Sequence, residues 1–205
     1  DWSSFVDNAL DQGECGSCWA FATKQAIELN HYIKFGMRIS LAAQQMVDCD
    51  TTNYGCNGGT PKNALINILK NGLTVDDYYP YDGVQGTCQV NVKNNFVLEA
   101  FESCSPGNCN REKLIDLLSK GPVVSTMDAD NLDFFLYDDG ILDYTCQNRN
   151  HAIVILGYYN DGIKEYFIGL NSYGMDWGNF GIFKFNVKDR DDCYLSYHAI
   201  LPKLS

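Results

Sequence analysis

Nine cysteines are the feature of this 205-residue sequence that most restricts its fold. Cytosolic thiols stay reduced, so this many cysteines predict disulfides and an oxidising compartment, whether lysosomal, vacuolar or reached by secretion. Nine is an odd number, so at least one thiol stays unpaired, and an unpaired thiol in such a compartment is either buried or reactive. Cys15 and Cys18 have CxxC spacing, but no second CxxC or HxxxH motif follows at zinc-finger distance, so we expect no metal site.

Charge and apolar patterning argue against two classes of partner. The chain has 26 acidic and 15 basic side chains, a formal net charge of −11 at pH 7. This charge would repel nucleic acid and anionic membranes, and it suits an acidic, degradative compartment. No run approaches the ~18 uninterrupted apolar residues of a membrane helix, and the start, Asp1-Trp2-Ser3-Ser4, lacks a signal-peptide pattern. We therefore expect a soluble, processed chain with no nucleic acid and no membrane as partner.

The first half of the chain is predicted to be mainly helical. Apolar residues recur every three or four positions over residues 19–33, which indicates an amphipathic helix that starts near residues 17–18. Ser40 can cap a second helix through residue 47, and a third is expected over 61–71 with Thr60 as its cap. Cys18 would then lie at a helix N-terminus.

The second half is predicted to be rich in β-strands. Asn110 can cap a helix over 111–120, after which β-branched and aromatic runs alternate with Gly, Asn and Asp turns. The expected strands cover 123–124, 152–156, 166–170 and 182–187. Helices followed by strands form an α+β pattern, and ligands bind preferentially in a cleft between two lobes.

One predicted hairpin brings a histidine and an asparagine together. Its turn is centred on Asp161, which lies equally far from His151 and Asn171, so the two should face each other to within one residue of register. An amide oxygen beside the ring can accept the imidazole N–H and fix its tautomer. The other histidines are His31, on the first helix, and His198, near the C-terminus, so His151 is the candidate base.

The ten residues that begin at Gln12, QGECGSCWAF, resemble the active-site segment of papain and the cathepsins. In that family a histidine and an asparagine follow the cysteine by roughly 130–150 residues. His151 and Asn171 stand at about this distance from Cys18. The sequence is therefore similar to the papain-like cysteine proteases, and the similarity extends over nearly the whole chain.

This resemblance implies a papain-like two-lobe α+β fold in a single peptidase domain over residues 1–205. The helical N-terminal lobe would cover about 10–110. An antiparallel, β-barrel-like lobe would cover about 111–205, and residues 1–9 would cross to it. The active site would lie in the cleft between the lobes.

The resemblance also implies a thiol-dependent endopeptidase that hydrolyses peptide bonds through a Cys18 thioester, in degradation or digestion at acidic pH. Such an enzyme needs no metal or organic cofactor. Its partners would be peptide and protein substrates, its own propeptide and cystatin-like inhibitors, and it would act as a monomer. The alternatives are an inactive homologue that serves as a binding or storage protein, and a metal or redox protein that uses the CxxC motif. Only Tyr173, where the family usually has tryptophan, supports the inactive homologue.

Four catalytic roles follow from chemistry and resemblance together. A thiol at a helix N-terminus feels the positive end of the helix dipole, and a histidine partner favours its thiolate, so Cys18 is expected as nucleophile with His151 as base. Asn171 would orient His151. By resemblance, Gln12 would donate its side-chain N–H to the oxyanion beside the backbone N–H of Cys18.

Substrate-binding residues are assigned by resemblance alone. Glycine-rich backbone would pair with the extended peptide, although these glycines could instead only form a turn near Cys56. The expected contacts are Gly16, Asn57, Gly58, Gly59, Thr60, Pro61, Thr126, Asn150, Trp177 and His198. Lys62 and Arg149 could add positive charge to the same pocket or could point to solvent.

Disulfide connectivity is also implied by the resemblance. Cys15–Cys56 and Cys49–Cys88 would brace the helical lobe, and Cys146–Cys193 would brace the β lobe. Cys104 and Cys109 would remain to close a short loop, which leaves Cys18 as the free thiol.

Overall fold

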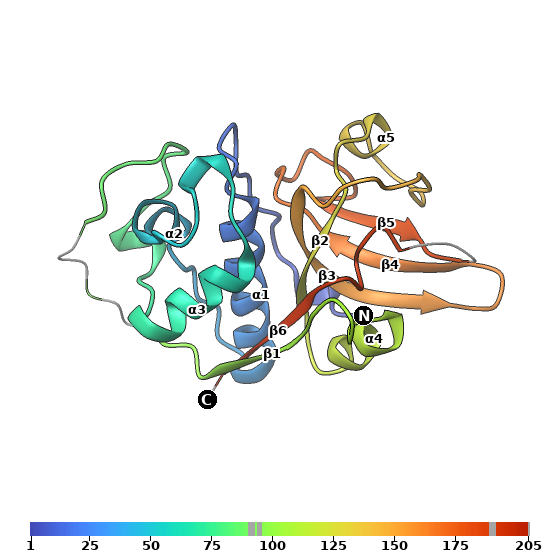
Figure 1. Ribbon diagram of the computed structural model, residues 1–205, viewed down its shortest axis with the longest axis horizontal. Helices are drawn as coiled ribbons and strands as arrows, with labels where there is room; N and C mark the ends of the chain where they lie inside the picture. The colour runs from blue at the N-terminus through green and yellow to red at the C-terminus, as the bar shows by residue number, and fades with distance from the viewer. Residues whose placement is uncertain (90–92, 94–95, 189–191, 205) are drawn as a thin grey trace.

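The computed structural model describes residues 1–89, 93, 96–188 and 192–204. Three helices form one side of the molecule and an antiparallel sheet with two further helices forms the other (Figure 1). The helices are α1 Cys18–Phe35, α2 Ala43–Cys49, α3 Pro61–Asn71, α4 Arg111–Leu118 and α5 Leu132–Phe135, with short 3-10 turns η1 Ser3–Phe5, η2 Gly55–Asn57 and η3 Asp76–Tyr78. The strands are β1 Ala100–Cys104, β2 Val123–Met127, β3 His151–Asn160, β4 Glu165–Leu170, β5 Ile182–Asn186 and β6 Ala199–Lys203. Among the described helices, none is long and apolar enough to cross a membrane.

The strand order of the sheet is β1-β6-β2-β3-β4-β5, and each named pair is antiparallel. Helices on one side and an antiparallel sheet on the other make this the α+β arrangement that the sequence predicted. β1 and β6, for which the sequence analysis had no strands, run from the sheet towards the helices, as Figure 1 shows. They were missed because their short runs contain Pro202 and charged residues, which weaken the strand signal.

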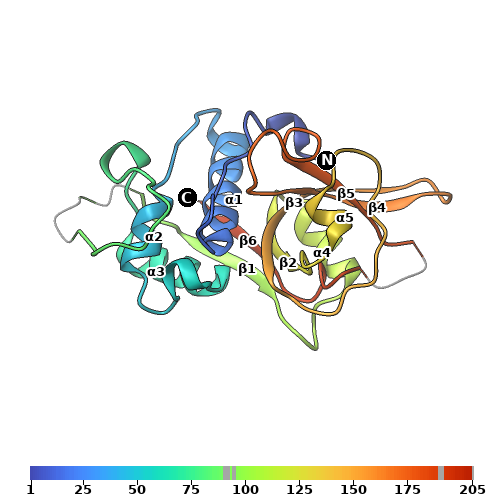
Figure 2. The ribbon, with the colours of Figure 1, turned by 90° about the horizontal axis from the view of Figure 1, so that it is seen from above.

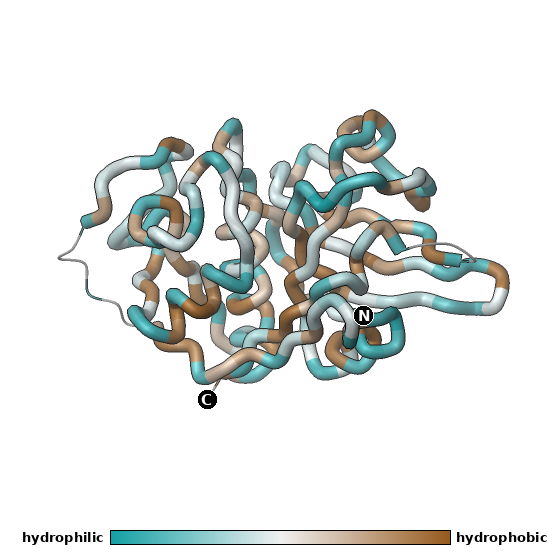
Figure 3. The backbone as a smooth tube through the Cα atoms, viewed as in Figure 1, coloured by the Kyte–Doolittle hydropathy of each residue, from teal (hydrophilic) through white to brown (hydrophobic). Residues whose placement is uncertain are grey.

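Buried apolar residues form three clusters. One fills the helical lobe around Trp19, a second fills the β lobe around Phe134, and a third joins the two. The third packs Ala22 and Ala26 of α1 against strands that include β3, so small side chains let this helix approach the sheet closely. Figure 2 shows α1 between the other helices and the sheet, and Figure 3 shows hydrophobic residues along this boundary.

Both ends of the chain cross between the lobes. Trp2 packs on the β-lobe core, and its indole Nε1 donates to the Leu118 carbonyl over 2.8 Å. From the other end, Ile200 and Leu204 pack into the helical-lobe core. Each lobe therefore contains residues from the opposite end of the chain.

Helix boundaries agree with the capping predictions at α3 and α4. Thr60 and Asn110 accept hydrogen bonds from the backbone N–H groups of Asn63 and Lys113, as N-caps should. The α4 helix ends two residues before the predicted position, at Leu118, whose carbonyl holds Trp2.

The predicted role of Ser40 is wrong. The second helix begins at Ala43, and its N-cap residue Ala42 makes no side-chain cap bond. Ser40 instead donates its hydroxyl to the Asp76 carboxylate over 2.7 Å. Ser40 therefore uses its hydroxyl in a tertiary contact with Asp76 and does not cap the second helix.

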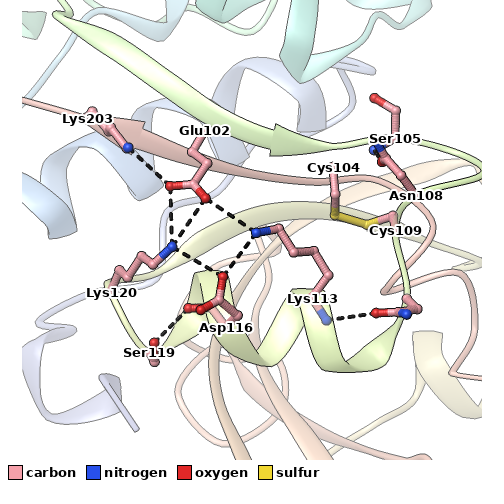
Figure 4. Close-up of polar contacts among 11 residues, drawn as sticks. Glu102, Cys104, Ser105, Asn108, Cys109, Lys113, Asp116, Ser119, Lys120 and Lys203 are labelled. Carbon is pink, nitrogen blue, oxygen red and sulfur yellow. Dashed lines mark hydrogen bonds and ion pairs between the residues drawn. A yellow bond between two sulfur atoms is a disulfide. The ribbon is translucent and has the colours of Figure 1, made fainter.

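A surface ion network fastens α4 to the crossing strands (Figure 4). The Glu102 carboxylate on β1 lies 3.5 Å from Lys113 of α4. It also lies 3.2 Å from Lys120, just after α4, and 3.1 Å from Lys203 on β6. Hydrogen bonds from Lys203 and Lys120 lower the pKa of Glu102. The neighbouring Cys104–Cys109 disulfide closes the loop between β1 and α4. Because these charges are partly exposed, the network contributes more to orientation than to stability.

A buried charge cluster joins α1 to the loops beside it. Lys24 of α1 bonds Asp76 over 2.6 Å, and Glu28, one turn later, accepts the backbone N–H of Leu41 over 2.6 Å. Burial raises the pKa of Glu28 to about 7, although Lys24 and the Leu41 N–H oppose the shift. The folded chain therefore keeps a proton on Glu28 in a pH range where the unfolded chain releases it.

This proton makes the stability of the fold depend on pH. Because the folded pKa exceeds the unfolded value of about 4.3, the stabilising contribution is lost as pH rises through about 7. Glu28→Gln mimics the protonated side chain, so its melting temperature relative to the parent should be higher at pH 7.5 than at pH 5. Thermal melts at both pH values test this, with the exposed Glu112→Gln as control. An equal difference at both pH values would contradict a raised Glu28 pKa.

Candidate active site

Cys18 is the first residue of α1 and the free cysteine among the nine, all of which are described. The structure pairs the other eight as the resemblance implied: Cys15–Cys56, Cys49–Cys88, Cys104–Cys109 and Cys146–Cys193. The first of these ties the residues before Cys18 to η2. Gly16 donates its N–H to the Cys56 carbonyl over 2.9 Å, and a Cβ on Gly16 would lie 2.4 Å from that oxygen. Only glycine fits this approach.

Backbone N–H groups act on the Cys18 sulfur. The first N–H groups of a helix have no carbonyl partner within it. Burial raises the pKa of the Cys18 thiol, whereas the N–H groups of Ala152, Trp19 and Cys18 itself lower it by bonding to the sulfur. Ala152 lies on β3, so the donors come from both lobes.

His151 is held by Asn171. The His151 Nε2 and Asn171 Oδ1 atoms lie 2.7 Å apart, and both residues are buried. The backbone N–H of Ser172 donates to the same oxygen over 2.8 Å, which fixes the orientation of the amide. His151 Nε2 must therefore be the donor, so in the neutral ring Nδ1 carries the lone pair. Burial lowers the pKa of His151 to about 4, although the bond to Asn171 opposes this.

A β-bulge places these two side chains on one face of the sheet. Asn160 pairs with Glu165 and Val154 with Leu170, so the register shifts by one residue between them, at Leu156. Extended by one pair, this register sets Asn171 opposite Ile153, two residues from His151 and therefore on the same face. Without the shift the two would point to opposite faces.

The predicted contact between His151 and Asn171 is thus present, but the predicted register is wrong by two residues. The turn occupies residues 161–164 instead of being centred on Asp161. The prediction placed His151 and Asn171 at equal distances from the turn and still identified the right pair. The longer turn and the bulge shift the register in opposite directions, so the two errors partly cancel.

Gln12 reaches the site through a short pairing of distant segments. Its backbone N–H donates to the Ser172 carbonyl over 2.9 Å, next to a bridge between Asp11 and Tyr173. The Ser172 hydroxyl donates to Gln12 Oε1 over 2.7 Å, and Gln12 Nε2 donates to the Cys15 carbonyl over 3.0 Å. An amide nitrogen has two hydrogens, so one remains for a further acceptor.

Ser172 is a contact residue of the candidate site that the sequence analysis missed. It holds Gln12 through its hydroxyl and Asn171 through its backbone N–H. Its position directly after Asn171 was the only available signal.

Aromatic rings cover the histidine. The ring centroid of Tyr173 lies 5.1 Å from that of His151, and that of Phe134 lies 6.0 Å away. Trp177, an expected substrate contact, packs on Phe134 at 4.9 Å and donates its Nε1 to the Phe134 carbonyl. These rings keep water from the His151–Asn171 bond.

One cavity includes Cys18 and His151 in its lining. Of the expected substrate contacts, Gly59, Thr60, Pro61, Thr126, Asn150 and His198 line it, whereas Gly16, Asn57, Gly58 and Trp177 do not. The amide of Asn150 is already engaged, since it donates to Asp128 and accepts from the Ala129 N–H. These bonds fix the orientation of the Asn150 amide and leave one Nδ2 hydrogen for a further acceptor.

Comparison with known proteins identifies the family. The profile of the papain family cysteine proteases matches residues 1–203. Zingipain-2 of Zingiber officinale is 38% identical over 210 residues, which cover 98% of this chain and 94% of that protein. The KDEL-tailed cysteine endopeptidase CEP2 of Arabidopsis thaliana is 39% identical over 190 residues, which are 90% of this chain but only 52% of that protein, so the chain spans about half of its length.

A solved structure gives the same result. The digestive procathepsin L2 proteinase of Tenebrio molitor larval midgut superposes with a TM-score of 0.90 at 33% identity, covering 100% of this chain and 67% of that one. Sequence, fold and the geometry around Cys18 agree, and the chain belongs to the papain family of cysteine proteases.

Proposed function

We propose that this chain is a thiol-dependent endopeptidase, with Cys18 as nucleophile, His151 as acid and base, and Asn171 as the residue that orients His151. One observation carries the proposal. The free cysteine starts a helix in the same cavity as a histidine whose far nitrogen is held by Asn171. These three residues are the nucleophile, the base and the orienting group of a catalytic triad.

The reaction proceeds in two steps. The Cys18 thiolate attacks the peptide carbonyl carbon, His151 gives its proton to the leaving nitrogen, and the C–N bond breaks to leave a thioester. His151 then takes a proton from water, whose oxygen attacks the thioester. The C–S bond breaks, the acid is released, and the Cys18 thiolate and the His151 imidazolium are restored.

Gln12 and the backbone N–H of Cys18 stabilise the oxyanion of each step. Gln12 Nε2 keeps one hydrogen after its bond to the Cys15 carbonyl, and Ser172 holds the other end of the amide. A fixed donor needs no reorganisation as charge develops, which is why such groups accelerate acyl transfer.

The peptide binds along the loop that leads into α3. Gly58 has a φ of +108°, a value that favours glycine, and a Cβ on Gly59 would lie 2.6 Å from Asn53 Oδ1. Exposed backbone can then pair with an extended substrate. The backbone groups that would bind the peptide outside the cavity are those of Gly16, Asn57 and Gly58.

The wider assignments rest on family and chemistry. We infer one peptidase domain over residues 1–205, because the two cores share residues from opposite ends of the chain. By family resemblance we expect it to act as a monomer. Four disulfides fit an oxidising compartment, and a lysosome, vacuole or secreted fluid would suit a degradative enzyme. The name of the Tenebrio relative, a procathepsin, supports a propeptide here, and cystatin-like inhibitors are the expected regulators.

Hydrolysis assays separate this function from its rivals. A fluorogenic peptide should be cleaved by the parent, with loss of activity after iodoacetamide or in Cys18→Ala and no loss with a chelator. Mass spectrometry of the unreduced protein should find the alkyl label only on Cys18. Full activity in Cys18→Ala would overturn the assignment, whereas an inactive parent with a labelled Cys18 would favour a binding or storage protein.

Tyr173 is expected to be compatible with turnover. Its ring already covers His151, and tryptophan offers a larger apolar face in the same place. Tyr173→Trp should therefore leave kcat/KM equal or slightly higher, measured against the control Tyr159→Trp on an exposed part of β3. A large loss confined to Tyr173→Trp would mean that the site requires tyrosine.

A further inference from the structure

The cavity beside Cys18 is basic in a strongly acidic protein. Lys62, Arg149 and His198 line it, while the chain as a whole carries a net charge of −11. Within the described residues, its lining contains no Asp or Glu. The positive charge here is therefore not neutralised by the wall of the cavity itself.

Three separate segments supply these side chains. Lys62 lies in the first turn of α3, Arg149 precedes β3 and His198 precedes β6. The Arg149 guanidinium lies 4.1 Å from the centre of the Tyr197 ring, a contact that holds the charge near the cavity. Burial lowers the pKa of His198, and the charges of Lys62 and Arg149 lower it further, so both cations lie close enough to act on His198.

Two buried polar atoms in this lining have no partner within the described structure. They are His198 Nε2 and Thr126 Oγ1. A buried hydrogen-bonding atom without a partner destabilises the fold, and a bound oxygen can restore the lost bond. Val124 and Ile200 add apolar surface to the same lining, which suits the methylene groups of a side chain that ends in oxygen atoms.

We propose that this cavity binds an acidic side chain of the substrate, so that the enzyme prefers Glu or Asp at the substrate position whose side chain enters it. A carboxylate would accept hydrogen bonds from His198 and Thr126 and would lie in the field of Lys62 and Arg149. The inference rests on the proposed peptidase function and adds its substrate class.

A comparison of matched peptides tests the charge alone. A peptide library that varies one substrate position at a time identifies the position whose side chain affects kcat/KM most. Peptides with Glu, Gln or Leu at that position are then compared by kcat/KM at about pH 6, above the glutamate pKa. We expect kcat/KM for Glu to exceed that for Gln by about tenfold, since opposite charges a few ångströms apart attract each other even in a partly wet site. Added NaCl should reduce this ratio through screening.

Variants assign the preference to the cavity. Lys62→Gln and Arg149→Gln should each lower the ratio of Glu to Gln cleavage severalfold, whereas Lys70→Gln, an exposed residue at the far end of the same helix, should not. The ratio is measured within one variant, so partial loss of folded protein does not affect it.

The outcomes separate the two proposals. Efficient cleavage of Leu peptides with no preference for Glu over Gln would overturn the acidic preference and leave the peptidase function intact. A Glu preference that survives both cavity variants would assign it to another site and equally overturn the inference. Cleavage of no peptide would contradict the peptidase function and the preference with it.

Discussion

The close packing of α1 against β3 is the constraint on which the site depends. Cys18 is the first residue of that helix and His151 is the first residue of that strand. Ala22 and Ala26 allow the two elements to approach, and the Ala152 N–H then reaches the Cys18 sulfur. The pair is therefore brought together by the interface between the lobes, and neither lobe alone could make it. Disulfides hold the loops on either side without taking part in this contact.

The charge state of the pair follows from opposing effects. Burial alone favours a neutral thiol and a neutral imidazole, because it raises the pKa of Cys18 and lowers that of His151 to about 4. Three backbone N–H groups, the helix dipole and the mutual attraction of the two charges favour the ion pair instead. The proposed mechanism uses the ion pair, and it therefore predicts that this attraction outweighs the desolvation. This balance is the central claim of the mechanism.

Local signals predicted local features well. Thr60 and Asn110 cap the helices they were expected to cap, since each finds its partner within three residues. Ser40 failed because its partner, Asp76, is distant in sequence and invisible to a local rule. The same limit hid β1 and β6, whose pairing joins segments about a hundred residues apart.

In the candidate site, too, local signals were predicted from the sequence and contacts between distant segments were not. Cys18, His151 and Asn171 were predicted from the family resemblance together with the hairpin and its chemistry, but the Leu156 bulge that aligns the last two has no residue signature of its own. Ser172 was missed because its role depends on Gln12, which joins it only in the fold. The basic cavity was an open alternative in the sequence, and the stacking of Arg149 on Tyr197 became apparent only from the structure.

An NMR titration of the His151 ring nitrogens tests the central claim most directly. In the parent, the nearby thiolate should keep His151 protonated at pH 6, with an apparent pKa above the ordinary value of about 6.5. In Cys18→Ala the counter-charge is absent, and burial should then bring the pKa of His151 down to about 4. A His151 that is neutral at pH 6 in both proteins would contradict the ion pair.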